Sequence, residues 1–182
     1  GMSALKDVNG DFSGVIYDEN AQTLTLFRDH MGIRPLYYYA DNSFMAFSTD
    51  IRGLLGLDGV DSSLNEDWIY RTLSGYFVDS VTSTEYQNIF CVSPASYITF
   101  SIKNEKIKQE IHSYWQLGKK KIHYTSFELY KAKLKELVMD SIQRRLQAIP
   151  GKAGAELSGG LDSGVIGILI HRLGRDCVYF SW

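Results

Sequence analysis

The sequence predicts an α+β region built on antiparallel strands, followed by the start of an α/β domain with a parallel sheet. In the first half, short runs of β-branched and aromatic residues are separated by gaps of a few residues, which favour antiparallel hairpins over crossovers. In the second half, strand, helix and strand patterns follow one another through short links, which is the order of a βαβ unit with parallel strands. The pattern changes near residues 115–125, so we divide the chain into two domains, 1–118 and 119–182.

The first domain is expected to contain six strands and two short helices. The strands are expected at 12–18, 23–28, 36–40, 43–49, 96–102 and 106–111, and the helices at 50–57 and 64–74. Asp50 and Ser63 are the expected N-caps, because short polar side chains accept hydrogen bonds from the free N–H groups of a helix start. Asn104 and Glu105 are the expected turn of the last hairpin.

The second domain follows a lysine run at 119–121, which we interpret as a solvated connector. Thr125 and Glu128 match a capping box, and apolar residues then recur at helical spacing up to Pro150. The remaining expected elements are a strand at 153–157, a helix at 162–173 that ends before Gly174, and a strand at 177–181.

The composition is that of an ordinary globular protein, and it excludes several classes of function. The 182 residues carry a net charge of -2 and have a pI near 6.1, which leaves no basic footprint for nucleic acid. No apolar run approaches the roughly 20 residues of a membrane helix, and no signal-peptide pattern is present. Cys91 and Cys177 are the only cysteines, which excludes a disulfide framework and a four-cysteine zinc site. We therefore expect a reduced, cytoplasmic protein without nucleic-acid or membrane partners.

One segment carries a specific chemical signal. It consists of Leu157, Ser158, Gly159, Gly160, Leu161, Asp162 and Ser163. Two adjacent glycines between a strand and a helix let the backbone approach an anion, and the helix N-terminus stabilises negative charge. The hydroxyl groups of Ser158 and Ser163 can donate to phosphate oxygens, whereas the carboxylate of Asp162 would repel a bare phosphate and so indicates a bridging Mg²⁺. The segment therefore suits a metal-bound pyrophosphate.

Other phosphate and nucleophile motifs do not fit this segment. No lysine follows the glycines as a Walker loop requires, and the G-x-G-x-x-G spacing of a dinucleotide site is absent. Glu156 stands where a nucleophile elbow needs glycine. A glycine-rich tight turn before a helix, with no ligand, stays open as the structural alternative.

The motif Ser-Gly-Gly-Leu-Asp-Ser at 158–163 resembles the pyrophosphate loop of N-type ATP pyrophosphatases, which include asparagine, GMP, NAD and argininosuccinate synthetases. Upstream, residues 10–18 are similar to the G-x-F-A-F-A-I-x-D strand of glutamine amidotransferase domains. Residues 28–38 are similar to their R-D-x-x-G-x-K-P-L-Y-Y turn, and residues 47–52 to the A-S-E-I-K segment that follows. This order of motifs resembles the glutamine-hydrolysing asparagine synthetase family.

The turn at 28–38 also has a physical interpretation of its own. Gly32 permits a positive φ, and Pro35 fixes the start of the strand that follows. Arg28 and Asp29 are expected to pair or hydrogen-bond within the fold rather than to act in catalysis.

The resemblance implies a partial amidotransferase domain of the N-terminal nucleophile hydrolase type at 1–118, and the start of an ATP pyrophosphatase domain at 119–182. In the family, ammonia from glutamine attacks an aspartate β-carboxylate that ATP has activated as an acyl-adenylate, which yields asparagine, AMP and pyrophosphate. ATP and Mg²⁺ are therefore the implied cofactors. Aspartate, with glutamine or ammonia, is the implied substrate of the full-length parent.

The chain departs from the family at both ends, so no catalytic residue is carried over. The family's nucleophile is a cysteine at the mature N-terminus, where this sequence has none. Cys91 and Cys177 are expected to be buried structural cysteines. The chain stops at Trp182, before the family's second acidic loop and its aspartate-binding residues. We therefore expect the chain to be inactive alone.

Two alternatives remain open. β-Lactam synthetases and lasso-peptide cyclases share the fold and activate a carboxylate with ATP, but they use an internal amine in place of ammonia. The other alternative is a non-catalytic truncated module. Half a domain leaves sheet edges and apolar faces uncovered, which favours self-association into a homo-oligomer.

Overall fold

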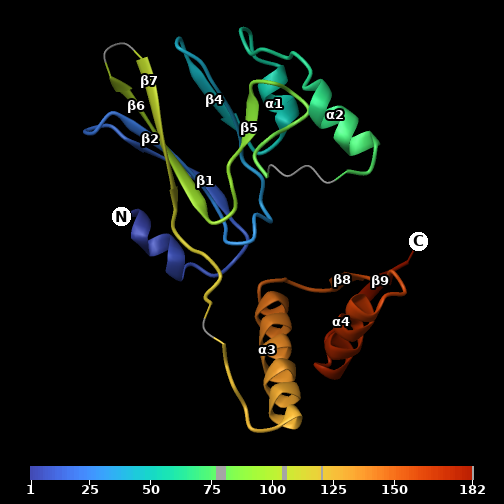
Figure 1. Cartoon of the computed structure of the whole chain (residues 1–182). Coiled ribbons are helices and arrows are strands. Elements are labelled where there is room, and N and C mark those ends of the chain that lie inside the picture. Colours follow the sequence, from blue (N-terminus) through green and yellow to red (C-terminus); the bar gives the residue numbers. More distant parts are fainter. Residues whose placement is uncertain (77–80, 104–105, 120, 182) are drawn as a thin grey trace. The chain divides into compact units, whose positions relative to one another are not determined.

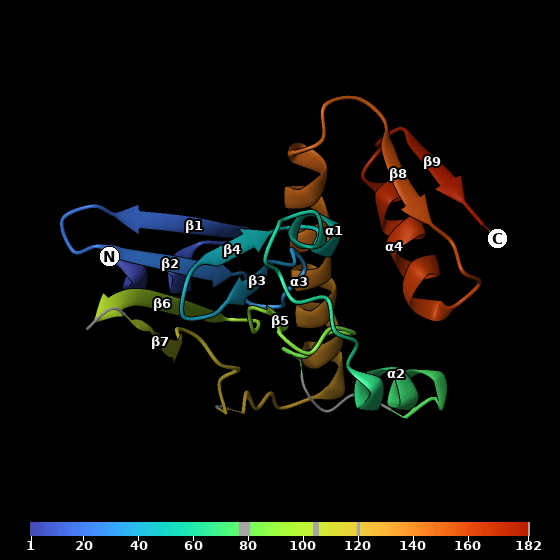
Figure 2. The same ribbon diagram turned by 90° about the horizontal axis from the view of Figure 1, so that it is seen from above.

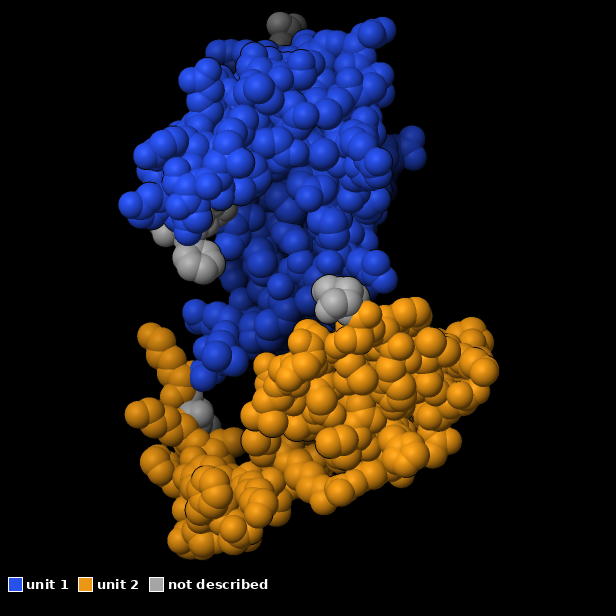
Figure 3. Space-filling view, turned by 90° about the vertical axis from the view of Figure 1, so that its right-hand side faces the viewer, with its two compact units in different colours: residues 1–118 blue, residues 119–182 orange. Residues whose placement is uncertain are grey.

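The computed structural model describes residues 1–76, 81–103, 106–119 and 121–181. The expected turn at Asn104 and Glu105, Lys120 of the lysine run, and Trp182 lie outside these residues. The chain forms two compact units, Gly1–Gly118 (unit 1) and Lys119–Trp182 (unit 2), which Figure 3 distinguishes by colour. The boundary between the units falls where the sequence pattern changes.

Unit 1 contains two antiparallel sheets (Figures 1 and 2). The larger sheet has the order β1-β2-β6-β7, with the strands Ser13–Asp18, Thr23–Arg28, Ser96–Lys103 and Lys106–Ser113. The smaller sheet has the order β4-β3-β5, with the strands Met45–Ser48, Tyr37–Ala40 and Ile89–Cys91. All these pairings are antiparallel, and those of β1 with β2, β3 with β4 and β6 with β7 are the hairpins that the short gaps predict. Strand β5 is not expected from the sequence, because three residues are too few to show an alternating pattern.

The core of unit 1 joins the two sheets. Leu26 of β2 and Ile98 and Phe100 of β6 pack with Tyr38 of β3, and the Tyr38 and Phe100 rings meet edge to face with centroids 5.5 Å apart. Successive side chains of a strand point to opposite faces, so this apolar set lies on one face while polar residues such as Thr99 lie on the other. Burial of the apolar face between the sheets is the main force that holds them together.

Helix α1 (Ile51–Leu55) follows β4 of the smaller sheet directly. The carboxylate of Asp50 accepts a hydrogen bond from the backbone N–H of Arg52 at 3.0 Å, so the predicted cap is confirmed. Before β1, a 3₁₀ segment, η1 (Met2–Asp7), forms a turn that the sequence pattern does not predict.

Helix α2 (Glu66–Leu73) has a different cap from the predicted one. The side chain of Asn65 accepts a hydrogen bond from the backbone N–H of Trp68 at 3.1 Å. The prediction of Ser63 as the cap is wrong, because Ser63 is held by Asp61, whose carboxylate accepts from both its N–H and its hydroxyl group.

Unit 2 is a βαβ unit preceded by a long helix. In chain order its elements are α3 (Phe127–Gln147), β8 (Ala153–Glu156), α4 (Leu161–Arg172) and β9 (Cys177–Phe180). Strands β8 and β9 pair in parallel, as predicted. The apolar cluster that joins the helices to the strands contains Ile142, Leu146, Ala153, Leu169 and Ile170. We find no membrane-spanning candidate among the helices of the described residues, and the 21-residue helix α3 carries charged side chains along its length.

The start of α3 differs from the prediction. Ser126 occupies the N-cap position without a side-chain hydrogen bond, so the capping box of Thr125 and Glu128 does not form. Glu128 lies instead beside Lys131, with 3.6 Å between carboxylate and ammonium. At the other end of unit 2, Gly174 has a φ of +66°, as expected of a residue that ends a helix.

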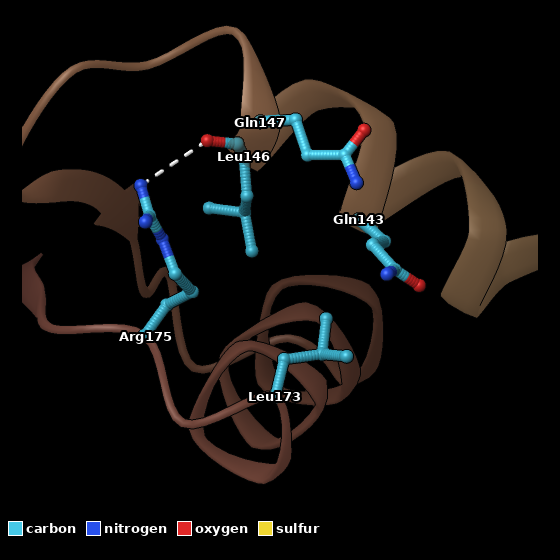
Figure 4. Close-up of a pocket in the computed structure, with 5 residues that line it drawn as sticks. All are labelled: Gln143, Leu146, Gln147, Leu173 and Arg175. Carbon is cyan, nitrogen blue, oxygen red and sulfur yellow. Dashed lines mark hydrogen bonds between the residues drawn. The ribbon is translucent and has the colours of Figure 1, made fainter.

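The C-terminus of α3 is closed by a side chain that is distant in sequence. Nη2 of Arg175 donates to the backbone carbonyls of Leu146, Ile149 and Gly151 at 3.2, 3.0 and 3.3 Å. Figure 4 shows the guanidinium group pointing at the carbonyl of Leu146. A cation at this position also opposes the negative end of the helix dipole, so Arg175 ties the end of α3 to the segment before β9.

A buried carboxylate organises the connection between β2 and β3. One oxygen of Asp29 accepts hydrogen bonds from the backbone N–H groups of Met31 and Ile33, both at 3.0 Å, and the other accepts from Arg34 N–H at 2.9 Å. Asp29 is 1% exposed. Burial alone would raise the pKa of Asp29, but the backbone N–H donors of Arg34, Ile33 and Met31 outweigh it and lower the pKa.

The neighbouring Arg28 bonds to a different set of groups. Its Nη1 donates to Cys91 Sγ at 3.0 Å and to the Val92 carbonyl at 2.9 Å, and its Nη2 donates to the Gly32 carbonyl. Arg28 and Asp29 thus hydrogen-bond within the fold, as predicted, but their side chains satisfy different backbone segments. Gly32 has a φ of +69°, which confirms the expected positive φ.

We predict that Asp29→Asn destabilises unit 1 by about 2 kcal/mol at pH 7, because an amide NH₂ group then faces backbone N–H donors. The folded pKa is lowered, so the stabilisation is complete above the unfolded value near 4 and is lost as the pH falls through the folded pKa. Urea unfolding of the unmutated chain and of Asp29→Asn should be measured from pH 7 downward. The difference between their free energies of unfolding should narrow only below about pH 4. A difference independent of pH would contradict the role of the charge.

We predict that Gly32→Ala destabilises the protein by at least about 2 kcal/mol, through both a positive φ and a steric clash. A Cβ atom at Gly32 would lie 2.7 Å from Cγ of Pro94 and 3.1 Å from Cζ of Arg28. Gly75→Ala is the matched control, because Gly75 has a φ of +73° with nothing within 4 Å of the added Cβ. Thermal and urea unfolding should show a larger loss of stability in Gly32→Ala than in Gly75→Ala. Equal losses of stability in the two variants would show that the contact with Pro94 and Arg28 is unimportant.

Candidate functional site

The segment at 157–163 forms the link between β8 and α4, as the sequence predicts. Leu157 still belongs to the sheet ladder, because its N–H donates to the Phe180 carbonyl at 2.7 Å. The chain then turns at Gly159, which has a φ of +77° and nothing within 4 Å of a Cβ added there. The turn therefore needs glycine for its backbone conformation and leaves open space beside it.

The two hydroxyl groups of the segment lie together. Oγ of Ser158 and Oγ of Ser163 are 3.1 Å apart, and the Ser163 hydroxyl also contacts the Ser158 N–H at 3.2 Å. Ser163 Oγ donates in turn to the Gly160 carbonyl at 3.2 Å. These bonds hold the loop closed around the first turn of α4 and bring together the two hydroxyls that the sequence singles out.

Helix α4 begins without a side-chain cap. Gly160 occupies the N-cap position, and its carbonyl accepts from the Gly164 N–H at 3.1 Å. The N–H groups of the first helical turn have no intrahelical acceptor, so they leave positive partial charge at this end of the helix. Leu161 and Asp162 are exposed at the same end, Leu161 with 82% of its surface.

The position of the loop depends on close contact between α4 and the strands. A Cβ added at Gly167 would lie 3.2 Å from Leu157 Cδ2 and 3.3 Å from Tyr179 Cε1. The Tyr179 hydroxyl also donates to the Gly167 carbonyl at 3.1 Å. Glycine at this point lets the helix approach β8 and β9, and this fixes the helix N-terminus beside the end of β8.

The described residues contain no group of three or more His, Cys, Asp or Glu side chains that could hold a metal ion. Asp162 contributes a single exposed carboxylate. Mg²⁺ is often held by one or two carboxylates together with phosphate oxygens and water. In the loop at 157–163, Asp162 is therefore the carboxylate available to a cation.

Cys91 does not have the environment of a nucleophile. It is 7% exposed at the end of β5, its Sγ accepts a hydrogen bond from Arg28, and burial raises the pKa of its thiol. This agrees with the predicted structural role. Cys177 is a free cysteine at the start of β9 and is half-buried rather than buried, so the prediction of a buried position is wrong for this residue. Its side chain packs against the apolar cluster of unit 2 from the margin rather than lying inside it.

Gly167 and Tyr179 are residues of this site that motif reasoning does not identify. The pattern of α4 marks Gly167 only as an interruption of an apolar run, and nothing in the sequence pairs it with Tyr179. A glycine inside an otherwise apolar helix is the one available signal, because such a residue usually has a packing reason.

Comparison with known proteins supports the amidotransferase motifs. Residues 1–115 match the family model of the glutamine amidotransferase domain. The chain is 29% identical over 173 residues to "Putative asparagine synthetase [glutamine-hydrolyzing] 2" of Methanocaldococcus jannaschii, which covers 93% of this chain and 32% of the relative. It is 30% identical over 165 residues to "Asparagine synthetase [glutamine-hydrolyzing] 3" of Bacillus subtilis, covering 87% of this chain and 25% of the relative.

A relative with a different name matches equally well. The chain is 30% identical over 179 residues to "Amidase chry2" of Gibberella zeae, which covers 95% of this chain and 25% of that protein. The chain thus spans about a quarter to a third of the length of these curated relatives. Because the matched family model covers well over half of its residues, and the motifs of the 28–38 turn lie within it, the chain belongs to the glutamine amidotransferase family, among relatives named glutamine-hydrolysing asparagine synthetases.

Proposed function

We propose that the chain is part of an ATP-dependent amidotransferase that resembles asparagine synthetase. In this proposal, unit 1 belongs to the domain that releases ammonia from glutamine, and unit 2 opens the ATP pyrophosphatase domain. The overall reaction converts aspartate, ATP and glutamine into asparagine, AMP, pyrophosphate and glutamate. The observation that carries the proposal is the geometry of the β8–α4 loop, which combines an uncapped helix N-terminus with two hydroxyl groups.

The loop residues fit the pyrophosphate of ATP in three respects. The free N–H groups of the first turn of α4 and the helix dipole attract negative charge. The hydroxyls of Ser158 and Ser163 can rotate away from their bonds to each other and to the Gly160 carbonyl, and can then donate their protons to phosphate oxygens. The positive φ of Gly159 and the open space beside it let an anion approach the backbone closely.

Asp162 completes the fit through Mg²⁺. Its carboxylate is exposed in the first turn of α4, where a bare phosphate would be repelled and a Mg²⁺-bound phosphate would not. Mg²⁺ would supply charge neutralisation for the departing pyrophosphate. The chain's own residues would bind and orient that group as the aspartate carboxylate is adenylated.

A second candidate keeps the loop and changes the attacking group, and the relative named an amidase fits it only loosely. In that case the same loop would bind ATP, but an internal amine of the substrate would attack the activated carboxylate in place of ammonia. Aspartate-dependent exchange of labelled pyrophosphate into ATP by a full-length parent would favour the asparagine synthetase reaction over this one.

We predict that Mg²⁺ with pyrophosphate shifts the backbone amide NMR signals of 158–163 in the ¹⁵N-labelled chain, with an affinity in the millimolar range. Gly159→Ala should weaken this affinity by about tenfold, because alanine disfavours the positive φ that shapes the loop. Asp162→Asn should reduce the gain in pyrophosphate affinity that Mg²⁺ provides.

Gly174→Ala is the matched control for Gly159→Ala. Gly174 lies at the opposite end of α4, has a φ of +66°, and also has open space beside it. Its replacement should cost similar stability and leave the pyrophosphate affinity unchanged. The proposed site would be contradicted if the NMR signals of 158–163 did not shift in the unmutated chain. It would also be contradicted if both variants lost pyrophosphate affinity equally.

A further inference from the structure

Helix α4 meets both strand segments of unit 2 at one residue, Gly167, which lies in the middle of the helix and is buried. A Cβ atom at Gly167 would lie 3.2 Å from Cδ2 of Leu157 and 3.3 Å from Cε1 of Tyr179. Leu157 follows β8 and is the first residue of the loop at 157–163, whereas Tyr179 belongs to β9. A single glycine therefore lets the helix backbone approach one side chain from each strand segment.

Two hydrogen bonds close this contact into a triangle. The Tyr179 hydroxyl donates to the Gly167 carbonyl at 3.1 Å, because a helix carbonyl keeps a second lone pair beyond its bond to the N–H of the next turn. The Leu157 N–H donates to the carbonyl of Phe180, the neighbour of Tyr179, at 2.7 Å. The start of the loop, β9 and the middle of α4 are thus tied to one another, and we call Leu157, Gly167 and Tyr179 the spacer.

The spacer fixes both ends of the loop at 157–163. One end is Leu157 itself, so its contact with Gly167 sets that end directly. The other end is the first turn of α4, which begins at Leu161. Leu161 and Gly167 belong to one helix and are about 9 Å apart along its axis, at a rise of about 1.5 Å per residue. The separation of the two ends of the loop therefore follows from how closely α4 approaches Leu157 and Tyr179.

Alanine at position 167 would widen this separation. Its methyl group would lie 3.2 and 3.3 Å from side-chain carbons of Leu157 and Tyr179, closer than the optimal distance of roughly 3.5–4.0 Å between carbon atoms. The methyl group would meet both side chains at once, so a rotation of one would not relieve the contact with the other. The helix would therefore move away from the strands, and its first turn would move with it.

We propose that the spacer sets the width of the loop at 157–163 and thereby its affinity for Mg²⁺-bound pyrophosphate, with Gly167 and Tyr179 as positioning residues. The affinity part of this proposal rests on the proposed function of the loop. A binding site needs its donors held within about 0.5 Å of the productive geometry, so a shift of a few tenths of an ångström in α4 matters. All the contacts join residues of unit 2 to one another, so the proposal needs no free surface.

The substitution Gly167→Ala separates this role from a role in helix stability. Alanine favours a helix more strongly than glycine does, so the gain in helix propensity opposes the cost of the closer contact. A glycine that mattered to stability alone would lower pyrophosphate affinity only as far as its replacement unfolds the chain. The spacer predicts a lower affinity in the folded variant.

The first test follows the loop without a ligand. In the ¹⁵N-labelled chain, both Gly167→Ala and Tyr179→Phe should shift the backbone amide NMR signals of 158–161. Ile168→Ala is the matched control, because Ile168 is the next residue of α4 and its side chain is rotated by about 100° around the helix axis. The control should leave the signals of 158–161 in place. The proposal is wrong if neither Gly167→Ala nor Tyr179→Phe shifts these signals.

The second test titrates the same variants with Mg²⁺ and pyrophosphate. Gly167→Ala should weaken the affinity about fivefold and Tyr179→Phe about threefold, whereas Ile168→Ala should change it less than about twofold. Urea unfolding establishes that each variant is folded, and Tyr179→Phe alone decides the test if Gly167→Ala does not fold. Equal losses of affinity in the spacer variants and in Ile168→Ala would overturn the proposal.

A double-mutant cycle tests the contact itself. Leu157→Ala removes the Cδ2 atom that a methyl group at position 167 would meet. Gly167→Ala should therefore cause a smaller loss of affinity in a Leu157→Ala background than in the unmutated chain, because residues in contact are not additive. Additive losses would show that the contact is not the cause.

These tests separate the spacer from the proposed function. If the unmutated chain does not bind pyrophosphate, the proposed function fails, while the ligand-free NMR signals still decide whether the spacer shapes the loop. If the unmutated chain binds pyrophosphate and folded Gly167→Ala and Tyr179→Phe bind it equally well, the spacer proposal fails and the proposed function stands.

Discussion

A single buried residue, Asp29, connects its own turn to two other segments of unit 1. Asp29 closes the turn between the two sheets by accepting three backbone N–H bonds through its side chain. Its own backbone N–H donates to the Phe12 carbonyl before β1, and its carbonyl accepts from Ala95 before β6. The three side-chain bonds compensate for the cost of removing the carboxylate charge from water. A neutral side chain of the same size could not accept all three of them. The packing of the two sheets depends on this turn, because it sets where β3 begins relative to β2.

The arginine beside it explains why one cysteine is structural. Arg28 reaches from the end of β2 to Cys91 and Val92 at the end of β5, and to the turn glycine, Gly32. One side chain thus links the last strand of the smaller sheet to the larger sheet. Cys91 serves here as a small, buried acceptor whose pKa is raised by burial, and the opposite shift would be needed for a nucleophile. The turn motif that indicates the family therefore has a role in stability that stands apart from catalysis.

The sequence predicts most of this fold because the decisive signals are local. Alternation, short gaps and glycine positions indicate the hairpins, the turn at Gly32 and the end of α4 at Gly174. The errors in the predicted helix caps arise because a predicted capping residue interacts with another side chain instead. Ser63 is taken by Asp61 and leaves the cap of α2 to Asn65, while Glu128 pairs with Lys131 and leaves Thr125 without a capping box. Arg175 at the end of α3 depends on residues more than 20 positions away, which no local pattern encodes.

The loop at 157–163 and an apolar groove lined by residues of α3, β8 and α4 are physically connected through β8. The loop lies where it does because α4 packs on β8 and β9 at Gly167, with Tyr179 bonded to the helix backbone. The cluster around Ala153, Leu169 and Ile170 supports that packing, and one of its sides is the apolar groove. A two-stranded sheet is marginal by itself, so whatever covers this groove also strengthens the support of the loop. The shape of the proposed phosphate loop therefore depends on the packing of α4 against the strands as well as on the glycines and hydroxyls of the motif.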